Sequence, residues 1–277
     1  MVYQVDNMSL NCIRDVFKGE VNDVYVCQDI MAPLTTYYTV LKVKKHETAK
    51  ELLESFETYS FSPIGVAADS DGLLVVFPYR QERKLDDFYM GETYSIQTCE
   101  AICINLIMEC ISCGLPYPLL YLILRQSEIH LQKDNSVYFG FSLDLSQFEK
   151  RRVEKDCVVK CASIVLDLLA DQSVTKAVSY ELMSRKVPRQ SYQRFTELYK
   201  DVKMAADSEA KAGIFKRLKA FLSRNSDTIF RIFIVLCSIL AITAIILILT
   251  QLIFGDVGFL RIFVNTFKKI GTESMLQ

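Results

Sequence analysis

The sequence predicts an α+β fold followed by a single membrane-spanning helix, on three observations. Residues 1–80 contain short runs rich in β-branched and aromatic residues, which are typical of strands. From Ser95 onwards the apolar residues recur mostly at helical spacing. Ile232 to Phe254 then form a run without a charged side chain. Strands followed by helices, rather than strict alternation of the two, indicate the α+β class.

Turn residues and apolar spacing give the expected order of elements along residues 1–206. Strands are expected at Cys12–Phe17, Val21–Ile30, Thr36–Lys44, Ile64–Ala68, Leu73–Pro78, Ser127–Leu131 and Ser136–Phe141. Helices are expected at His46–Tyr59, Ile96–Cys113, Lys155–Ala170 and Ser191–Ala206. The domain is therefore three strands, a helix, two strands, and then a mostly helical half that contains one hairpin.

Ile232 to Phe254 are expected to form a transmembrane helix. At about 1.5 Å of rise per residue, a helix of this length spans roughly the 30 Å hydrocarbon core of a bilayer. The alternative is a buried helix of a soluble core, but such helices are usually shorter. We therefore expect a protein anchored in the cell membrane by a single pass, with the lipid bilayer as one of its partners.

The cations on either side of this run predict its orientation. Six of them precede the run: Lys211, Lys216, Arg217, Lys219, Arg224 and Arg231. Three follow it: Arg261, Lys268 and Lys269. The positive-inside bias places the N-terminal domain in the cytoplasm and residues 255–277 outside. Nine cysteines, an odd number, indicate reduced thiols in a cytosolic domain rather than a disulfide framework.

Residues 207–231 are expected to form a basic amphipathic juxtamembrane helix. Apolar side chains recur at helical spacing from Ile214 to Leu222, and the first five of the six cations named above lie mostly opposite them. This pattern is typical of a helix in the lipid interface, so these five cations, with Arg231 just before the span, are our candidate membrane-interface residues. A stalk helix packed on the domain is the alternative. In the tail, apolar residues at Phe259, Phe263, Phe267 and Ile270 favour a second interfacial helix or a docking element for a membrane subunit.

The order of elements over residues 10 to 206 resembles the two-lobed protein kinase fold, with an N-lobe at about 1–80 and a C-lobe at about 81–206. Tyr38 to Val43 resembles the strand whose lysine, here Lys42, holds the nucleotide phosphates. Leu73 to Tyr79 is similar to the strand that enters the hinge. Asp156 to Leu169 and Tyr192 to Leu198 resemble two helices of the C-lobe.

The residues of phosphoryl transfer do not carry over from this resemblance. Kinases need a glycine-rich loop, a catalytic Asp and metal ligands. The turn 18–23 has one glycine and two acids. Ile123 stands at the position of the catalytic Asp, and Phe141 at that of the metal-binding Asp. Asp144 would serve only if the register shifted. The resemblance therefore implies a pseudokinase, with no catalytic residue and no cofactor.

Lys42 is the one candidate cofactor-binding residue, and two interpretations stay open. It would bind a phosphate or another anion, or it would pair with a glutamate of the following helix, Glu51, Glu54 or Glu57. A zinc site is not expected. Cys99, Cys103, Cys110 and Cys113 lie along one helix over about 21 Å, too far apart for one ion. His46 and His130 belong to no nucleophile or metal motif.

We expect a non-catalytic, membrane-tethered scaffold that binds a protein partner through its cytoplasmic domain, and a membrane subunit through its tail. A cytosolic pseudokinase followed by one span resembles, in layout, the EssB/YukC component of type VII secretion machines. The alternatives are a divergent ATP-dependent protein kinase or nucleotide-sensing membrane switch, and a sensor whose tail reports to the domain. A net charge of −1 argues against nucleic acid as a partner.

Overall fold

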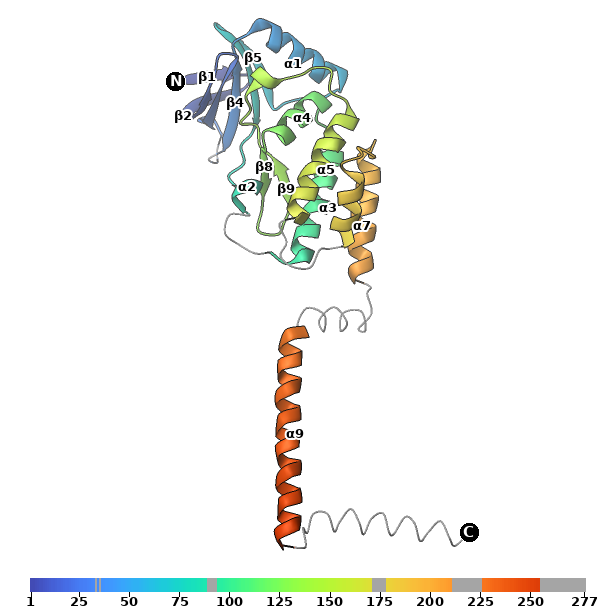
Figure 1. The fold of residues 1–277 in the computed structure, drawn as a ribbon. Helices are drawn as coiled ribbons and strands as arrows, with labels where there is room; N and C mark the ends of the chain where they lie inside the picture. Colours follow the sequence, from blue (N-terminus) through green and yellow to red (C-terminus); the bar gives the residue numbers. More distant parts are fainter. Residues whose placement is uncertain (33, 35, 89–93, 171–177, 211–225, 255–277) are drawn as a thin grey trace, which may run out of the picture. The chain divides into compact units, whose positions relative to one another are not determined.

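The computed structural model describes the chain except residues 33, 35, 89–93, 171–177, 211–225 and 255–277 (Figure 1). The chain divides into two compact units, Met1–Lys211 and Ala212–Gln277. Each unit is described by itself below. The first unit contains every described strand, so the expected α+β class is confirmed.

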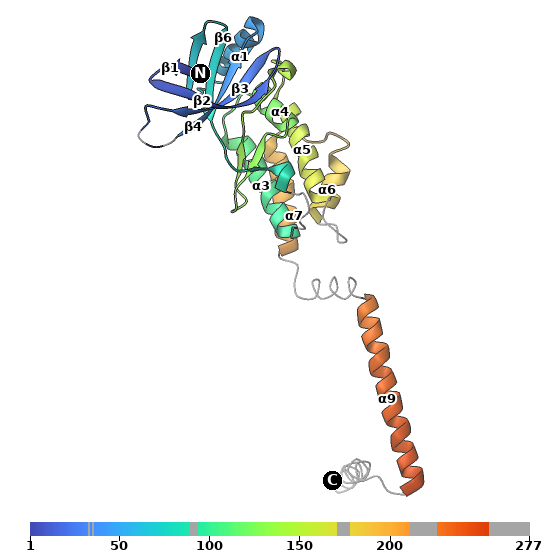
Figure 2. The ribbon, with the colours of Figure 1, turned by 90° about the vertical axis from the view of Figure 1, so that its left-hand side faces the viewer.

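A six-stranded antiparallel sheet forms the strand-rich part of the first unit (Figure 2). Its order is β1-β2-β3-β4-β6-β5. The strands are β1 (Val2–Val5), β2 (Met8–Lys18), β3 (Asn22–Asp29), β4 (Tyr37–Val43), β5 (Gly65–Asp69) and β6 (Gly72–Pro78). β5 and β6 form a hairpin in which Asp69 pairs with Gly72. Gly72 has a φ of 155° and its α-carbon faces the carbonyl of Val43, so a side chain would not fit there.

Both faces of this sheet are buried, because the sheet carries two separate apolar clusters. One face packs against α1 (His46–Thr58), where Leu41 and Val43 of β4 join Leu52 and Phe56. The other face encloses its own cluster: Tyr3, Val5, Leu10, Tyr25, Cys27, Val40, Leu74 and Val76. Successive residues of β4 therefore alternate between the two clusters, as the period of two in a strand requires.

β1, which was not predicted from the sequence, brings the two edges of the sheet together. It pairs with β2 and also lies against β5 at the other edge. A β-carbon on Gly65 of β5 would lie 2.8 Å from Cγ1 of Val5, so the two strands meet closely at this glycine. Tyr3 and Val5 thereby complete the second cluster.

Helices and a small sheet form the rest of the described first unit, the helical part (Figure 1). The helices are α3 (Ile96–Ser112), α4 (Tyr117–Arg125), α5 (Glu154–Ala170), α6 (Val178–Lys186) and α7 (Phe195–Ala210). The small sheet has the order β7-β8-β9, with β7 (Arg83–Lys84), β8 (Ile129–Leu131) and β9 (Val137–Phe139). The short helix α2 (Leu85–Phe88) follows β7, and a 3₁₀ turn, η1 (Leu145–Gln147), follows β9.

Helix α3, which like α5 has 17 residues, has clear signals at both ends. The side chain of Ser95 caps its start by accepting a hydrogen bond from the backbone N–H of Thr98. Gly114, with a φ of 63°, stops it.

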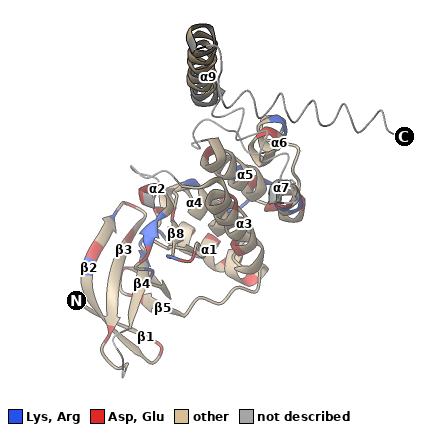
Figure 3. Ribbon diagram, turned by 90° about the horizontal axis from the view of Figure 1, so that it is seen from below, with Lys and Arg blue, Asp and Glu red and all other residues tan. Residues whose placement is uncertain are grey.

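In the view of Figure 3, parts of the ribbon that contain Lys and Arg lie among parts that contain Asp and Glu.

Most expected elements of the first unit are confirmed, with shifted ends. The helix expected at Ser191–Ala206 begins only at Phe195 and runs to Ala210. The hairpin expected at residues 127–141 is shorter, since β8 and β9 have three residues each. α4 and α6 were not predicted.

The second unit contains α9, Ser226–Phe254, which is six residues longer at its start than the expected transmembrane helix. In the described part of the chain, Phe233–Thr250 is the one segment long and apolar enough to cross a membrane, with a mean hydropathy of 3.0. None of this segment is buried within the protein. Its hydroxyl groups bond to the helix itself: Ser238, Thr243 and Thr250 donate to carbonyls one turn back. The surface of the segment Phe233–Thr250 is therefore apolar.

Candidate functional site

The segment 141–145 lies where the six-stranded sheet meets the helical part. It leaves β9, passes beneath the start of β3 and enters η1. The resemblance to kinases places the metal-binding Asp in this segment, so its contacts decide what the junction can hold.

Asn22, the first residue of β3, binds this segment from the side of the sheet. It is fully buried. Its Nδ2 donates to the carbonyl of Leu143 at 2.9 Å, and its Oδ1 accepts from the N–H of Leu145 at 2.8 Å. Both polar atoms of one amide are thus used on two residues of the same segment. A buried amide or backbone group without a hydrogen-bond partner would cost about 1–3 kcal/mol. The two hydrogen bonds of Asn22 therefore hold Leu143 and Leu145 firmly against β3.

Gln126, just after α4, binds the residue between them from the helical part. Its Nε2 donates to the carbonyl of Asp144 at 2.8 Å, and its Oε1 accepts from the N–H of Asp144 at 2.9 Å. The side-chain amides of Asn22 and Gln126, which we call the amide clamp, therefore hold residues 143–145 through their backbone. This leaves the segment little freedom to move toward a ligand.

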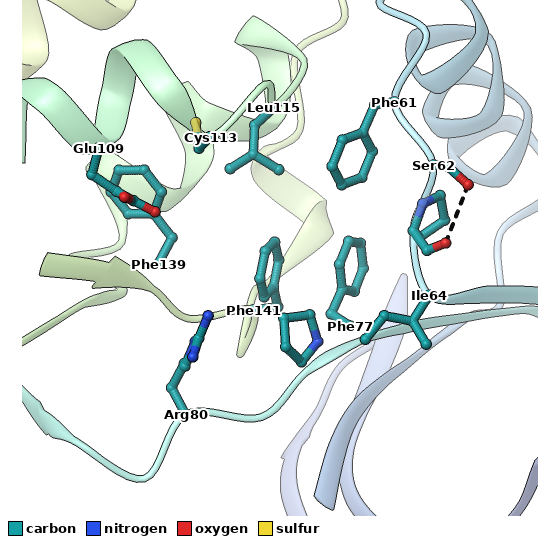
Figure 4. Close-up of a pocket in the computed structure, with 12 residues that line it drawn as sticks. Phe61, Ser62, Ile64, Phe77, Arg80, Glu109, Cys113, Leu115, Phe139 and Phe141 are labelled. Carbon is teal, nitrogen blue, oxygen red and sulfur yellow. Dashed lines mark hydrogen bonds between the residues drawn. The ribbon is translucent and has the colours of Figure 1, made fainter.

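Aromatic rings fill the junction beside the clamp. The ring of Phe141 stacks on that of Phe77 at the end of β6, with centroids 4.2 Å apart and planes 8° apart (Figure 4). Phe61 and Phe56 extend this group at 6.4 Å from Phe77. Such contacts stabilise beyond the burial of area alone. We call these four residues the aromatic column; it joins the sheet to the helical part.

The positions that catalysis would need have structural roles. Ile123 is fully buried in α4, and Phe141 belongs to the aromatic column. The carboxylate of Asp144 accepts from the N–H of Ser146 at 2.9 Å and so caps the turn η1. In the part of the chain that the structure describes, no group of three or more His, Cys, Asp or Glu residues is arranged to hold a metal ion.

The carboxylate of Asp23 binds the backbone of the turn that precedes β3. Asp23 accepts from the N–H of Gly19 at 3.3 Å and pairs with Lys44 at 2.9 Å. The hydroxyl of Tyr25 donates to the same carboxylate at 3.2 Å. The backbone N–H that a phosphate would use here is thus already bound to a carboxylate.

Lys42 lies on the face of β4 that points away from α1. Its Nζ pairs with Asp69 at 2.6 Å and with Asp71 at 3.6 Å, and its side chain is 8% exposed. The expected pair with a glutamate of the following helix is therefore wrong. The register is the reason: Leu41 and Val43 face α1, so the residue between them must face the other cluster. The hydrogen bond to Asp69 raises the pKa of Lys42, and an anion would have to compete with two carboxylates.

Of the three glutamates considered for that pair, Glu54 has a different partner. It pairs with Lys150, in the loop between η1 and α5. That pair lowers the pKa of the Glu54 carboxyl. Glu51 and Glu57 are exposed. The carboxylate of Glu54 thus links α1 to the loop after residues 143–145, rather than to the sheet.

A buried charged group lies on the small sheet. Glu128 is 3% exposed; Lys84 of β7 donates to its Oε1, and Nε2 of His130 lies 3.6 Å from its Oε2. Nδ1 of His130 lies 2.7 Å from the carbonyl of Glu82. A β-carbon on Gly140 would come within 2.5 Å of Nε2 of His130, so glycine is required beside this pair. This group ties β7 to the hairpin β8–β9.

The cysteines of α3 are buried, except Cys113, which is partly exposed. The prediction of small buried side chains is thus confirmed for Cys99, Cys103 and Cys110. Burial raises the pKa of the Cys113 thiol to about 11 and that of Cys110 well above its usual range. These thiols are therefore protonated at neutral pH and are poor metal ligands.

Of the candidate membrane-interface residues, Arg231 lies in α9 and is exposed. Lys211, Lys216, Arg217, Lys219 and Arg224 lie outside the described residues. So do the tail residues from Phe259 to Ile270. Their proposed roles stay predictions.

Two residues that shape the junction were missed from sequence. Asn22 was assigned only to a turn, and Gln126 was given no role. Nothing in the local pattern distinguishes them, because their partners lie 121 and 18 residues away. Phe141 was identified by position, but its stacking partner Phe77 was not.

Comparisons with known proteins add no further assignment. No protein family matches this chain, and no match is found among curated proteins.

Proposed function

We propose that this protein is a membrane-tethered pseudokinase, which acts without catalysis as a protein-interaction scaffold within a secretion or signalling assembly of the cell membrane. The order of strands and helices over residues 8–210 supports the kinase-like part of the proposal. The strands and helices that the sequence predicted between β2 and α7 follow one another in the expected order.

One observation carries the non-catalytic part: side chains of the protein occupy the junction between sheet and helices, and the hollow lined by Phe77 and Phe141 has only about 230 Å³. The stacked rings of Phe77 and Phe141 occupy it, and the amide clamp fixes residues 143–145 beside them. Lys42 faces the opposite side of the sheet. A nucleotide with its magnesium would therefore meet no prepared phosphate or metal ligand.

The experiment is a thermal unfolding measurement on the full chain in lipid nanodiscs, with and without millimolar ATP and magnesium. A ligand that binds only the folded state raises the unfolding temperature. We expect no measurable rise. A rise of several degrees that disappears in Lys42→Ala would overturn the proposal in favour of a divergent kinase or a nucleotide-sensing switch. Lys18→Ala, an exposed lysine of β2, is the matched control.

The membrane part of the proposal rests on α9, whose central segment is apolar and unburied. Arginine in place of each of Ile242, Ala244 and Ile246 would place three charges near the bilayer centre, at a cost of about 2.5–3.5 kcal/mol each. Carbonate extraction should then release this triple variant but retain the wild type and Ala244→Leu. Retention of all three would contradict a single apolar span.

The orientation is proposed from the excess of cations before the span. An epitope tag placed after Gln277 should be accessible from outside intact cells, and one placed before Met1 should be accessible only after permeabilisation. The reverse pattern would place the domain outside and refute a cytoplasmic scaffold.

A further inference from the structure

Two segments that flank Leu115 carry exposed apolar side chains. Tyr59 and Ile64 belong to the segment between α1 and β5, and they are 36% and 45% exposed. Met108 and Ile111 lie three residues apart on α3 and are both 43% exposed. Residues at this spacing are neighbours on a helix surface. We call these four residues, with Leu115 between the two segments, the Leu115 strip.

Two hollows lie on either side of Leu115. One, of about 230 Å³, is lined by residues that include Phe61, Ile64 and Cys113 (Figure 4). The other, of about 240 Å³, is lined by residues that include Tyr59, Ile111 and Gly114. Each is smaller than the roughly 300–1,000 Å³ of a typical small-molecule site. Each is suited instead to one large apolar side chain.

Glu109 gives the strip an electrostatic preference. It lies on α3 at the wall of the first hollow, on the same side as Phe139 (Figure 4). Burial raises the pKa of this carboxyl, although the charge of Arg80 opposes the effect. Arg80 itself lies over the ring of Tyr138 at 4.5 Å. Glu109 forms no salt bridge within the described residues, so its partly buried charge is left for a cation to neutralise.

We propose that the Leu115 strip binds an amphipathic segment of a partner protein, with a large apolar side chain in each hollow and a Lys or Arg beside Glu109. The proposal rests on the scaffold function and names where and what the scaffold binds. Apolar anchors at helical spacing are the usual means by which such segments occupy a groove. Arg80 lines the same hollow but lies over the ring of Tyr138 and forms no salt bridge with Glu109, so this acid favours a basic residue of the partner.

The test uses the full chain in nanodiscs as bait for a displayed library of random 15-residue peptides. We expect enriched peptides to contain two or more large apolar residues and at least one Lys or Arg. Ile111→Asp should weaken their binding at least tenfold, because it places a charge at the second hollow. Met204→Asp, at a 52% exposed site on α7, should leave binding unchanged. Ile64→Asp repeats the test from the other segment should Ile111→Asp unfold.

Charge reversal tests the role of Glu109. Glu109→Lys should weaken the same peptides at least tenfold, and peptides with Glu in place of their basic residue should recover binding to this variant. Glu109→Gln should have a smaller effect.

Three results would overturn this proposal. The first is that the enriched peptides bind Ile111→Asp and Glu109→Lys as tightly as the wild type. The second is that no peptide is enriched. The third is that a second copy of the chain covers the strip. In the last case sedimentation would show a dimer that Ile111→Asp dissociates. None of these concerns nucleotide binding, so failure of the strip is distinguishable from failure of the pseudokinase assignment, which the ATP experiment tests.

Discussion

Asn22 and Leu143 lie 121 residues apart along the chain and are joined by a buried hydrogen bond of 2.9 Å. The same amide also binds the N–H of Leu145. This one side chain thus connects the first residue of β3 to the loop after β9. It closes the junction in which a kinase-like protein would hold its nucleotide.

The first prediction concerns this amide. Asn22→Ala would leave a buried carbonyl and a buried N–H without partners, so the free energy of unfolding should fall by about 2–4 kcal/mol. Urea denaturation of the full chain in detergent micelles measures it. Asn7→Ala, at an exposed turn, is the control and should change stability little. Equal stabilities of the two variants would show that the clamp contributes nothing.

The second prediction concerns Phe141. Phe141→Ala should lower the free energy of unfolding by about 3–5 kcal/mol, because it removes a buried ring from the stack on Phe77. Phe141→Leu should cost less, since it keeps most of the volume. Phe141→Asp should destabilise the fold without producing ATP turnover. Turnover by that variant would mean that a single acid restores a metal site, contrary to the filled junction.

The third prediction concerns the ion pair between Lys42 and Asp69. A double-mutant cycle between Lys42→Met and Asp69→Asn should give a coupling energy of about 1 kcal/mol in unfolding experiments, because the lysine side chain is largely buried. The same cycle between Lys18 and Asp15, which are both exposed, should give no measurable coupling. Coupling of Lys42 to Glu54 instead would restore the original expectation of a pair with α1.

The fourth prediction concerns pH. Burial raises the pKa of the Glu128 carboxyl, but hydrogen bonds from His130 and Lys84 lower it more, to a net value below the ordinary 4.5. A carboxyl whose pKa is lower in the folded state than in the unfolded state stabilises the protein at pH values above its unfolded-state pKa. This stabilisation is lost as the pH falls through the folded-state pKa. Between pH 6 and pH 3, Glu128→Gln should therefore lose less stability than the wild type. The exposed control Glu57→Gln should follow the wild type; a Glu128→Gln profile parallel to it would refute the ionic role.

The sequence predicted the order of elements well because turns and apolar spacing are local signals. α1, α3, α5 and the strands β2 to β6 were all found near their observed positions. β1 was missed because its four residues alternate too briefly to be distinguished, and its burial depends on Gly65, sixty residues onwards. α4 was missed because an apolar run of nine residues is short for a helix and not specific to one.

The junction was harder to predict than the fold. The absence of an acid at Ile123 and Phe141 could be read directly, but the contacts that these two side chains and their neighbours make could not. The direction of Lys42 depends on the register of β4, and a shift of one residue moves a side chain to the other face of a sheet. No local pattern fixed that register, so the wrong partner was expected for Lys42.

The contact between β1 and β5 at Gly65 has a consequence for how copies of this chain meet one another. Strands at a free edge present unpaired N–H and carbonyl groups, to which another chain can add a strand. Here the two outer strands of the six-stranded sheet, β1 and β5, lie against each other at this glycine. A strand from a neighbouring copy would therefore have to separate them before it could pair with either edge at this point.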